Sequence, residues 1–167
     1  DPSTGLVAFD YDHDGILDLF SAHWYYQYGY YNRCVQDDLF RGDGAGGFTL
    51  VTEQAGMATE STYWDPDDVH ANTDNRPTWG ATGCDVDGAG WTEIFTPSYG
   101  RMWNRMWKQD GTGIFTDVGR ELGYASDANE DYSDDMFFGC HCHEYADEDA
   151  PECDPMPPEP QISCGSL

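Results

Sequence analysis

The sequence predicts an all-β protein made of two four-stranded antiparallel, blade-like repeats with acidic loops, followed by an irregular cysteine-rich tail. Three observations predict it. A long segment occurs twice, each copy contains short apolar runs separated by Gly- and Asp-rich turns, and the C-terminal segment loses this pattern. With 167 residues, the chain is long enough to bury a hydrophobic core.

The repeat is visible when the chain is aligned with itself. GLVAFDYDHDGILDLF, from Gly5, aligns with GATGCDVDGAGWTEIF, from Gly80. A second block follows in the same order, LFRGDGAGGFTLVTEQAGM from Leu39 and MWKQDGTGIFTDVGRELGY from Met106. The copies differ mainly in loop length, so they are two examples of one supersecondary unit. The predicted boundaries are repeat 1 at 1–57, a linker loop at 58–79, repeat 2 at 80–125 and an acidic Cys/Pro-rich tail at 126–167.

Periodicity and turn residues predict the strands of each unit. In repeat 1 we expect strands at residues 6–9, 16–20, 39–41 and 48–52. GDGAGG predicts a hairpin turn, because Gly and Asp tolerate positive φ. A helical turn ended by Gly56 should follow, with a counterpart at 120–123. Four short antiparallel strands per copy match the size of one β-propeller blade.

The stretch DYDHDGILDLF crowds four carboxylates against an apolar run. Like charges this close repel, so we expect a cation among them. Calcium takes roughly six to eight oxygens, and a tight loop offers carboxylates at positions 1, 3, 5 and 9 and a carbonyl at position 7. Gly15, at position 6, permits the sharp turn. The predicted ligands are Asp10, Asp12, Asp14, the carbonyl of Ile16, and Asp18.

Repeat 2 contains a reduced version of this loop, with Gly90 at the turn. Its predicted ligands are Asp85, Asp87, Ala89, the carbonyl of Trp91, and Glu93. Because Ala89 has no carboxylate, only a backbone oxygen or a water can fill that position. We therefore expect the second site to bind calcium more weakly than the first.

Other interpretations of the two loops fit less well. An EF-hand needs a Glu at position 12 and flanking helices, whereas position 12 is Ser21 or Thr96 and the following residues have strand character. Magnesium suits a nearly complete set of protein oxygens less well than the larger calcium ion. A solvated acidic turn without metal remains the alternative at both loops.

Taken together, these blocks and the pairs Asn32-Arg33 and Asn104-Arg105 between them resemble the FG-GAP/VCBS-type repeat. Such repeats occur in integrin-like propellers and in secreted bacterial and cartilage acidic proteins. The resemblance covers residues 5–57 and 80–124 and implies a propeller blade with structural calcium in its first hairpin. It also implies an extracellular role in adhesion, matrix or surface assembly. A propeller usually closes with about seven blades, so this chain is either part of a longer propeller or packs against other copies.

Charge and cysteine content agree with an extracellular location. The chain has 7 Lys and Arg against 32 Asp and Glu, a net charge of −25, which repels nucleic acids and anionic membranes and attracts cations. No stretch approaches the ~18 apolar residues of a membrane span. Its six cysteines predict an oxidising compartment and up to three disulfides, and buried free thiols are the alternative. We expect a secreted or cell-surface protein.

Two further segments carry candidate binding residues. CHCHE, from Cys140 through His143 to Glu144, suits zinc or copper, although disulfide anchoring of its cysteines is favoured. The tract WYYQYGYY fits a carbohydrate or protein interface, or simple packing on the sheet. Its aromatic residues are Trp24, Tyr25, Tyr26, Tyr28, Tyr30 and Tyr31.

No catalytic motif occurs: there is no GxSxG, HExxH or Gly-rich phosphate loop, so we expect no enzyme. The predicted function is an extracellular, calcium-stabilised structural or adhesive repeat protein, the subunit of a surface fibre or layer. Exposed sheet edges and abundant aromatic residues predict self-assembly. The alternatives are a carbohydrate-binding module, a secreted hydrolase fragment, or part of a seven-bladed propeller.

Overall fold

The computed structural model describes residues 2–27, 31–59, 75–99, 103–125, 139–146, 153–154 and 156–159. The chain forms two compact units, Asp1–Ser126 and Asp127–Leu167. Both predicted repeats lie in the first unit, and the second corresponds to the predicted tail.

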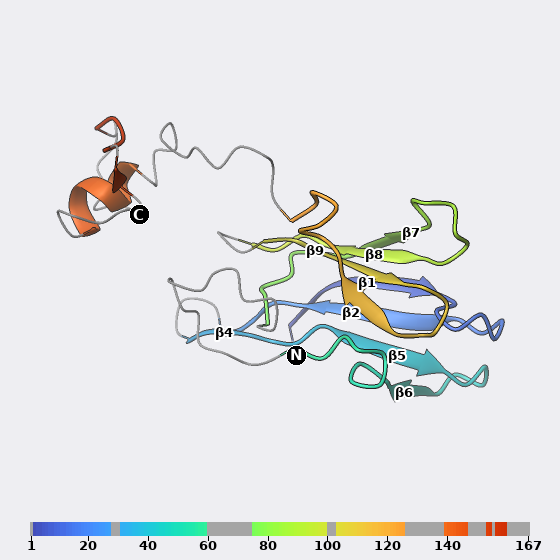
Figure 1. Cartoon of the computed structure of the whole chain (residues 1–167). Coiled ribbons are helices and arrows are strands. Elements are labelled where there is room, and N and C mark those ends of the chain that lie inside the picture. Colours follow the sequence, from blue (N-terminus) through green and yellow to red (C-terminus); the bar gives the residue numbers. More distant parts are fainter. Residues whose placement is uncertain are drawn as a thin grey trace. The chain divides into compact units, whose positions relative to one another are not determined.

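The first sheet is formed by repeat 1 and is antiparallel throughout (Figure 1). Its strands, in spatial order, are β1 (Ser3–Phe9), β2 (Asp18–His23), β5 (Asp38–Gly42) and β6 (Phe48–Leu50). The prediction of four antiparallel strands is confirmed. Strand β2 begins at Asp18 rather than at residue 16, because the bend of the acidic loop extends through Ile16.

The second sheet repeats this arrangement in repeat 2. Its strands, in order along the chain, are β7 (Thr82–Cys84), β8 (Glu93–Thr96), β9 (Arg105–Gln109) and β10 (Phe115–Asp117). The spatial order is β10-β9-β8-β7, so sequential strands are neighbours. Each sheet is followed by a hydrogen-bonded turn that ends at a glycine with positive φ, Gly56 at 73° and Gly123 at 76°. These turns stand where helical turns were predicted.

The aromatic tract lies outside the four strands of the first sheet. It contributes β3 (Tyr25–Gln27) and β4 (Tyr31–Cys34), which pair as a separate antiparallel hairpin. Tyr28 and Tyr30 lie outside the described residues, as do residues 60–74 of the predicted linker. At the end of this linker, Thr78 forms an isolated antiparallel bridge with Ser98, which joins it to repeat 2.

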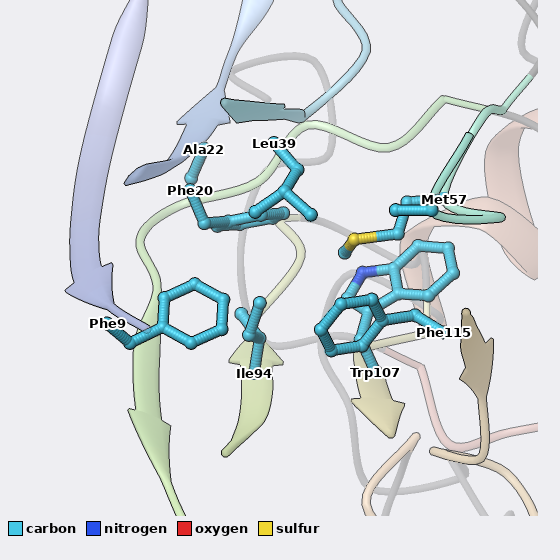
Figure 2. Packing of buried hydrophobic residues seen from close by; sticks show 9 residues of the cluster. Phe9, Phe20, Ala22, Leu39, Met57, Ile94, Trp107 and Phe115 are labelled. Carbon is cyan, nitrogen blue, oxygen red and sulfur yellow. The ribbon is translucent and has the colours of Figure 1, made fainter. Parts of the chain in front are cut away.

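The hydrophobic core lies between the two sheets (Figure 2). Phe20 and Leu39 from the first sheet and Ile94 from the second are fully buried, and burial of each such side chain contributes roughly 1.5–3 kcal/mol. Met57, from the turn after β6, extends toward Trp107 and joins the same cluster. The complete cluster comprises Phe9, Phe20, Ala22, Leu39, Ala55, Met57, Ile94, Trp107 and Phe115.

The second unit contains a short helical segment, including a π-helix at His141–Tyr145 (η2). The CHCHE segment is thus helical. Cys142 is bonded to Cys153, and Cys140 is also disulfide-bonded. Cys34 and Cys84 are thiols, so the disulfides do not reach the maximum of three. Among the described residues, no helix has the length and apolar character that crossing a bilayer requires.

Candidate metal centres

Each acidic loop connects the first two strands of its sheet, and the two loops share one backbone conformation. Position 4 has positive φ in both, 57° at His13 and 73° at Gly88. Position 6 does as well, 83° at Gly15 and 89° at Gly90. Glycine adopts this region without a steric cost, so a histidine there needs a compensating contact. Gly15 and Gly90 therefore permit the sharp turn of each loop, as predicted.

Three carboxylates converge in the first loop. Oxygens of Asp10, Asp12 and Asp18 lie within 4.8 Å of one another. Asp18 is fully buried, and its two oxygens accept hydrogen bonds from the backbone N–H groups of Tyr11 and Gly42, each at 2.8 Å. Burial raises the pKa of Asp18 above its ordinary value, although these two bonds oppose the shift. The loop thus concentrates negative charge around a carboxylate held in one orientation.

The first aspartate of each loop is held in the same way. Asp10 accepts hydrogen bonds from the backbone N–H groups of Gly15, at 2.9 Å, and Asp14, at 3.1 Å. In the second loop, Asp85 accepts a bond from the N–H of Gly90 at 2.8 Å. These bonds fold each loop back over its own carboxylates and orient them before any ligand arrives.

Asp14, a predicted ligand, does not belong to the converging set. It is paired with Arg41 of β5, whose Nη2 lies 2.9 Å from Asp14 Oδ2 and whose Nε lies 2.8 Å from Asp12 Oδ2. The hydrogen bond from Arg41 holds the pKa of Asp14 below its ordinary value. Ile16 donates its N–H to Asp14 Oδ1 at 2.9 Å, and the role of its carbonyl as a ligand stays a prediction.

The second loop brings together Asp85, Asp87 and Glu93, whose oxygens also lie within 4.8 Å of one another. Glu93 is 1% exposed, and its Oε2 accepts the N–H of Val86 at 2.9 Å. Its Oε1 has no hydrogen-bond partner among the described residues. A buried carboxylate oxygen without a partner is unfavourable, and a bound cation is one group that satisfies it. Ala89 contributes only backbone, donating its N–H to Asp87 Oδ1.

Sequence reasoning missed the basic partners of these loops. Lys108 of β9 pairs with Asp87, and its hydrogen bond lowers the pKa of that carboxyl. Lys108 and Arg41 occupy equivalent positions in the second block of each repeat, MWK and LFR. This shared base was visible in the alignment, but its proximity to the acidic loop depends on strand order, which the alignment does not contain.

The two loops also contact each other. The rings of His13 and Trp91 are stacked, with centroids 3.8 Å apart and an interplanar angle of 11°. Gln109 Nε2 donates to the carbonyl oxygen of Tyr11 at 2.7 Å, a second link between the repeats. The predicted ligand position Trp91 therefore has a side chain that packs on the other loop. Both acidic clusters lie in one region of the first unit.

A separate aromatic cleft of about 430 Å³ lies in the first unit. Trp24 packs edge-on against Trp79, with centroids 4.8 Å apart, and Trp79 is stacked with Tyr99 at 5.6 Å. Pro2 and Thr4 complete its lining. Trp79 and Tyr99 belong to other segments than the predicted tract, so the sequence did not connect them with Trp24.

The remaining residues of the aromatic tract are only partly described. Tyr25 packs edge-on against Trp24, and Tyr26 is 68% exposed. Tyr31 lies in β4. In the second unit, both cysteines of CHCHE are disulfide-bonded, which leaves no thiolate there for a transition metal.

No family model matches the chain, and no curated protein matches it.

Proposed function

We propose that the chain is a calcium-binding structural module of the extracellular space or cell surface, built from two repeats of the FG-GAP/VCBS type. The observation that carries the proposal is the equivalent convergence of three carboxylates in both repeats. In each cluster the last member is buried at the start of a strand, Asp18 in the first and Glu93 in the second. A single acidic turn arises easily by chance, whereas two equivalent ones sharing a loop conformation indicate a common purpose.

The donor set favours calcium over other metals. Every converging side chain is a carboxylate, and hard divalent cations prefer such oxygens, whereas copper and zinc favour nitrogen and sulfur. In the first loop the Ile16 carbonyl would add a further oxygen, toward the roughly six to eight that calcium takes. Asp14 would add another once calcium displaces Arg41 from its carboxylate. A bound ion would stabilise the folded state, because the unfolded chain does not assemble either cluster.

Calcium removal tests the proposal. A chelator should lower the melting temperature of the purified chain by several degrees, and calorimetric titration should show two sites of unequal affinity. Asp12→Ala should weaken binding more than Asp87→Ala, because the first loop has more carboxylates. Glu53→Ala removes an exposed acid outside both clusters and is the matched control. Absence of calcium by elemental analysis, with a melt unaffected by chelator, would contradict the proposal.

The structural and extracellular parts of the proposal have separate support. Disulfide-bonded cysteines in the second unit favour an oxidising compartment. The net charge of −25 favours a calcium-rich medium, where cations reduce repulsion between neighbouring molecules. The proposal assigns no catalytic role to the chain.

The aromatic cleft favours carbohydrate binding as a second candidate function. Stacked, exposed rings such as Trp79, which is 62% exposed, offer apolar faces on which sugar rings pack. Retardation of the chain in gels containing soluble polysaccharides, lost in Trp79→Ala, would support this function. Equal mobility with and without each polysaccharide would contradict it.

A further inference from the structure

The face of the first sheet that points away from the second sheet is apolar and open. Strand register places Ala8, Leu19, Phe40 and Leu50 in one row across β1, β2, β5 and β6. Leu50 is 53% exposed and Leu19 and Phe40 are of intermediate exposure. We call the following residues the outer face of sheet 1: Leu6, Ala8, Leu19, Phe40, Phe48 and Leu50. Large exposed side chains gathered on one sheet face are unusual for an isolated soluble protein.

The repeat shows what such a face packs against. In the second sheet, Ile94, Trp107 and Phe115 lie on the face buried against the first sheet. In the alignment of the two repeats, Leu19 corresponds to Ile94, Phe40 to Trp107 and Phe48 to Phe115. The outer face of sheet 1 is thus the counterpart of a face that this chain already buries.

The opposite side of that internal interface also has a counterpart in repeat 2. The first repeat contributes Phe20, Leu39 and the turn residues Ala55 and Met57 to the core. The corresponding residues of repeat 2 are Phe95, Met106, Leu122 and Tyr124, which we call the outer face of sheet 2. Phe95 and Tyr124 are half-buried and pack edge to face at 5.0 Å. Met106 is buried, at 4% exposure, so Leu122 is the exposed member of this surface.

The turns strengthen this correspondence. Internally, the backbone N–H of Phe115 donates to the carbonyl of Ala55 at 2.8 Å, so the turn of repeat 1 is tied to the last strand of repeat 2. The corresponding pair is Phe48 and Leu122, at opposite ends of the module. Both are apolar and open, at 48% and 56% exposure. Ala55, by contrast, is 2% exposed within the internal interface.

We propose that the outer face of sheet 1 binds the outer face of sheet 2 of a second copy of this chain, repeating the internal interface head to tail. The contact is heterologous, so each added copy leaves one face of each kind open, and growth continues unless a ring closes. This inference deepens the structural role proposed above and does not require calcium in either loop. Its experiment therefore distinguishes failure of assembly from failure of metal binding.

The net charge opposes the association of identical copies, so ionic strength matters. Each chain has a net charge of −25, so repulsion between copies is strong at low salt. At 0.15 M salt, charges farther apart than about 8 Å are largely screened, whereas contacts between apolar faces persist. Assembly should therefore increase with salt, the reverse of an association driven by ion pairs.

Two blocked variants test the geometry by light scattering at about 0.15 M salt. The parent chain should form oligomers that grow with concentration. Phe48→Asp closes one face and Leu122→Asp closes the other, so each variant alone should be monomeric. An equimolar mixture should form one-to-one dimers and nothing larger, because each variant retains the face that the other lacks. Leu50→Asp is a second variant for the first face.

A control variant has its substitution outside both outer faces. Met156→Asp changes a residue that is 50% exposed in the second unit, and should leave assembly intact. Circular dichroism confirms that each variant is folded, and titration with calcium and with chelator measures the metal sites independently. A parent chain that stays monomeric at every concentration would overturn the inference. So would oligomers of Leu122→Asp alone, which indicate a symmetric contact, or a lowered melt of monomeric Phe48→Asp, which indicates a face covered within one chain.

Discussion

Arg41 and Lys108 place positive charge beside the acidic loops, at equivalent positions of β5 in the first sheet and β9 in the second. The crowding of aspartates was evident from the sequence, and so was the need for a cation nearby. The chain supplies part of that charge itself. Exposed ion pairs of this kind contribute only about 0–1 kcal/mol, so they relieve repulsion without abolishing the attraction for a divalent ion. Residue types and spacing were thus predictable, whereas this pairing depends on tertiary structure.

Asp37 gives the first unit a predicted pH dependence. Its carboxylate accepts hydrogen bonds from the backbone N–H of His23 and from the hydroxyl Oγ1 of Thr78, both at 2.7 Å. Loss of hydration raises its pKa from 3.8 to about 6, and these bonds only partly oppose the shift. Because the folded pKa exceeds the unfolded one, the folded state binds the proton more tightly. The contribution of Asp37 to stability is therefore full below pH ~4 and is lost as pH rises through about 6.

Asp37→Asn should remove this dependence. The free energy of unfolding of the variant, relative to the parent, should rise by up to about 3 kcal/mol between pH 4 and pH 7. Urea denaturation at several pH values, in chelator, measures the difference directly. Carboxyls with lowered pKa, such as Asp43, act below pH ~4 and cancel in the comparison. A constant difference across this range would show that Asp37 is hydrated in the folded protein.

At the scale of elements, the strands of the two sheets were predictable from the sequence, because they are short apolar runs bounded by Asp- and Gly-rich turns. β3 and β4 were not, because WYYQYGYY is aromatic on every side and has no period of two. The short turns after β6 and β10 were predicted through Gly56 and Gly123. The contact between the acidic loops was not, since it requires the two sheets to pack face to face.

Substitutions of His13 test the left-handed conformation of the first acidic loop. Its φ of 57° costs a non-glycine residue about 1 kcal/mol, and its stack on Trp91 compensates by roughly 0.5–1.5 kcal/mol. His13→Ala loses the stack and keeps the strain, whereas His13→Gly loses both, as in the second loop, where Gly88 stands at this position. We expect the Ala variant to be less stable than the Gly variant by about 1 kcal/mol.

Urea denaturation of the two variants in chelator gives this comparison without a contribution from metal. An Ala variant as stable as the Gly variant would mean that residue 13 does not hold a left-handed conformation. Trp91→Ala is the complementary change. It should destabilise the parent chain more than it destabilises His13→Gly, because the stack is already absent there.

At the scale of the whole molecule, the paired repeats and the distinct tail were predictable from self-alignment and composition. The division between Ser126 and Asp127 lies beside the predicted boundary. The outer faces could have been found in the alignment, since Leu19, Phe40 and Phe48 match residues that are apolar in repeat 2. What the sequence could not show is which face of each sheet is buried, because both faces of sheet 1 are apolar.

The two units should respond differently to a reductant. The second unit depends on the disulfide Cys142–Cys153 and on the disulfide of Cys140. Cys142 and Cys153 are 11 residues apart in the sequence, and closing such a loop stabilises the folded state by about 3 kcal/mol. In the first unit Cys34 and Cys84 are thiols, so reduction leaves that unit unchanged. Proteolysis in reductant should therefore cleave within 127–167 first, while the melting transition of the first unit and its calcium titration persist. In native protein without reductant, a bulky thiol reagent should label exposed Cys84 quickly and buried Cys34 only after unfolding. Loss of the first unit's transition in reductant would show that its core depends on a disulfide.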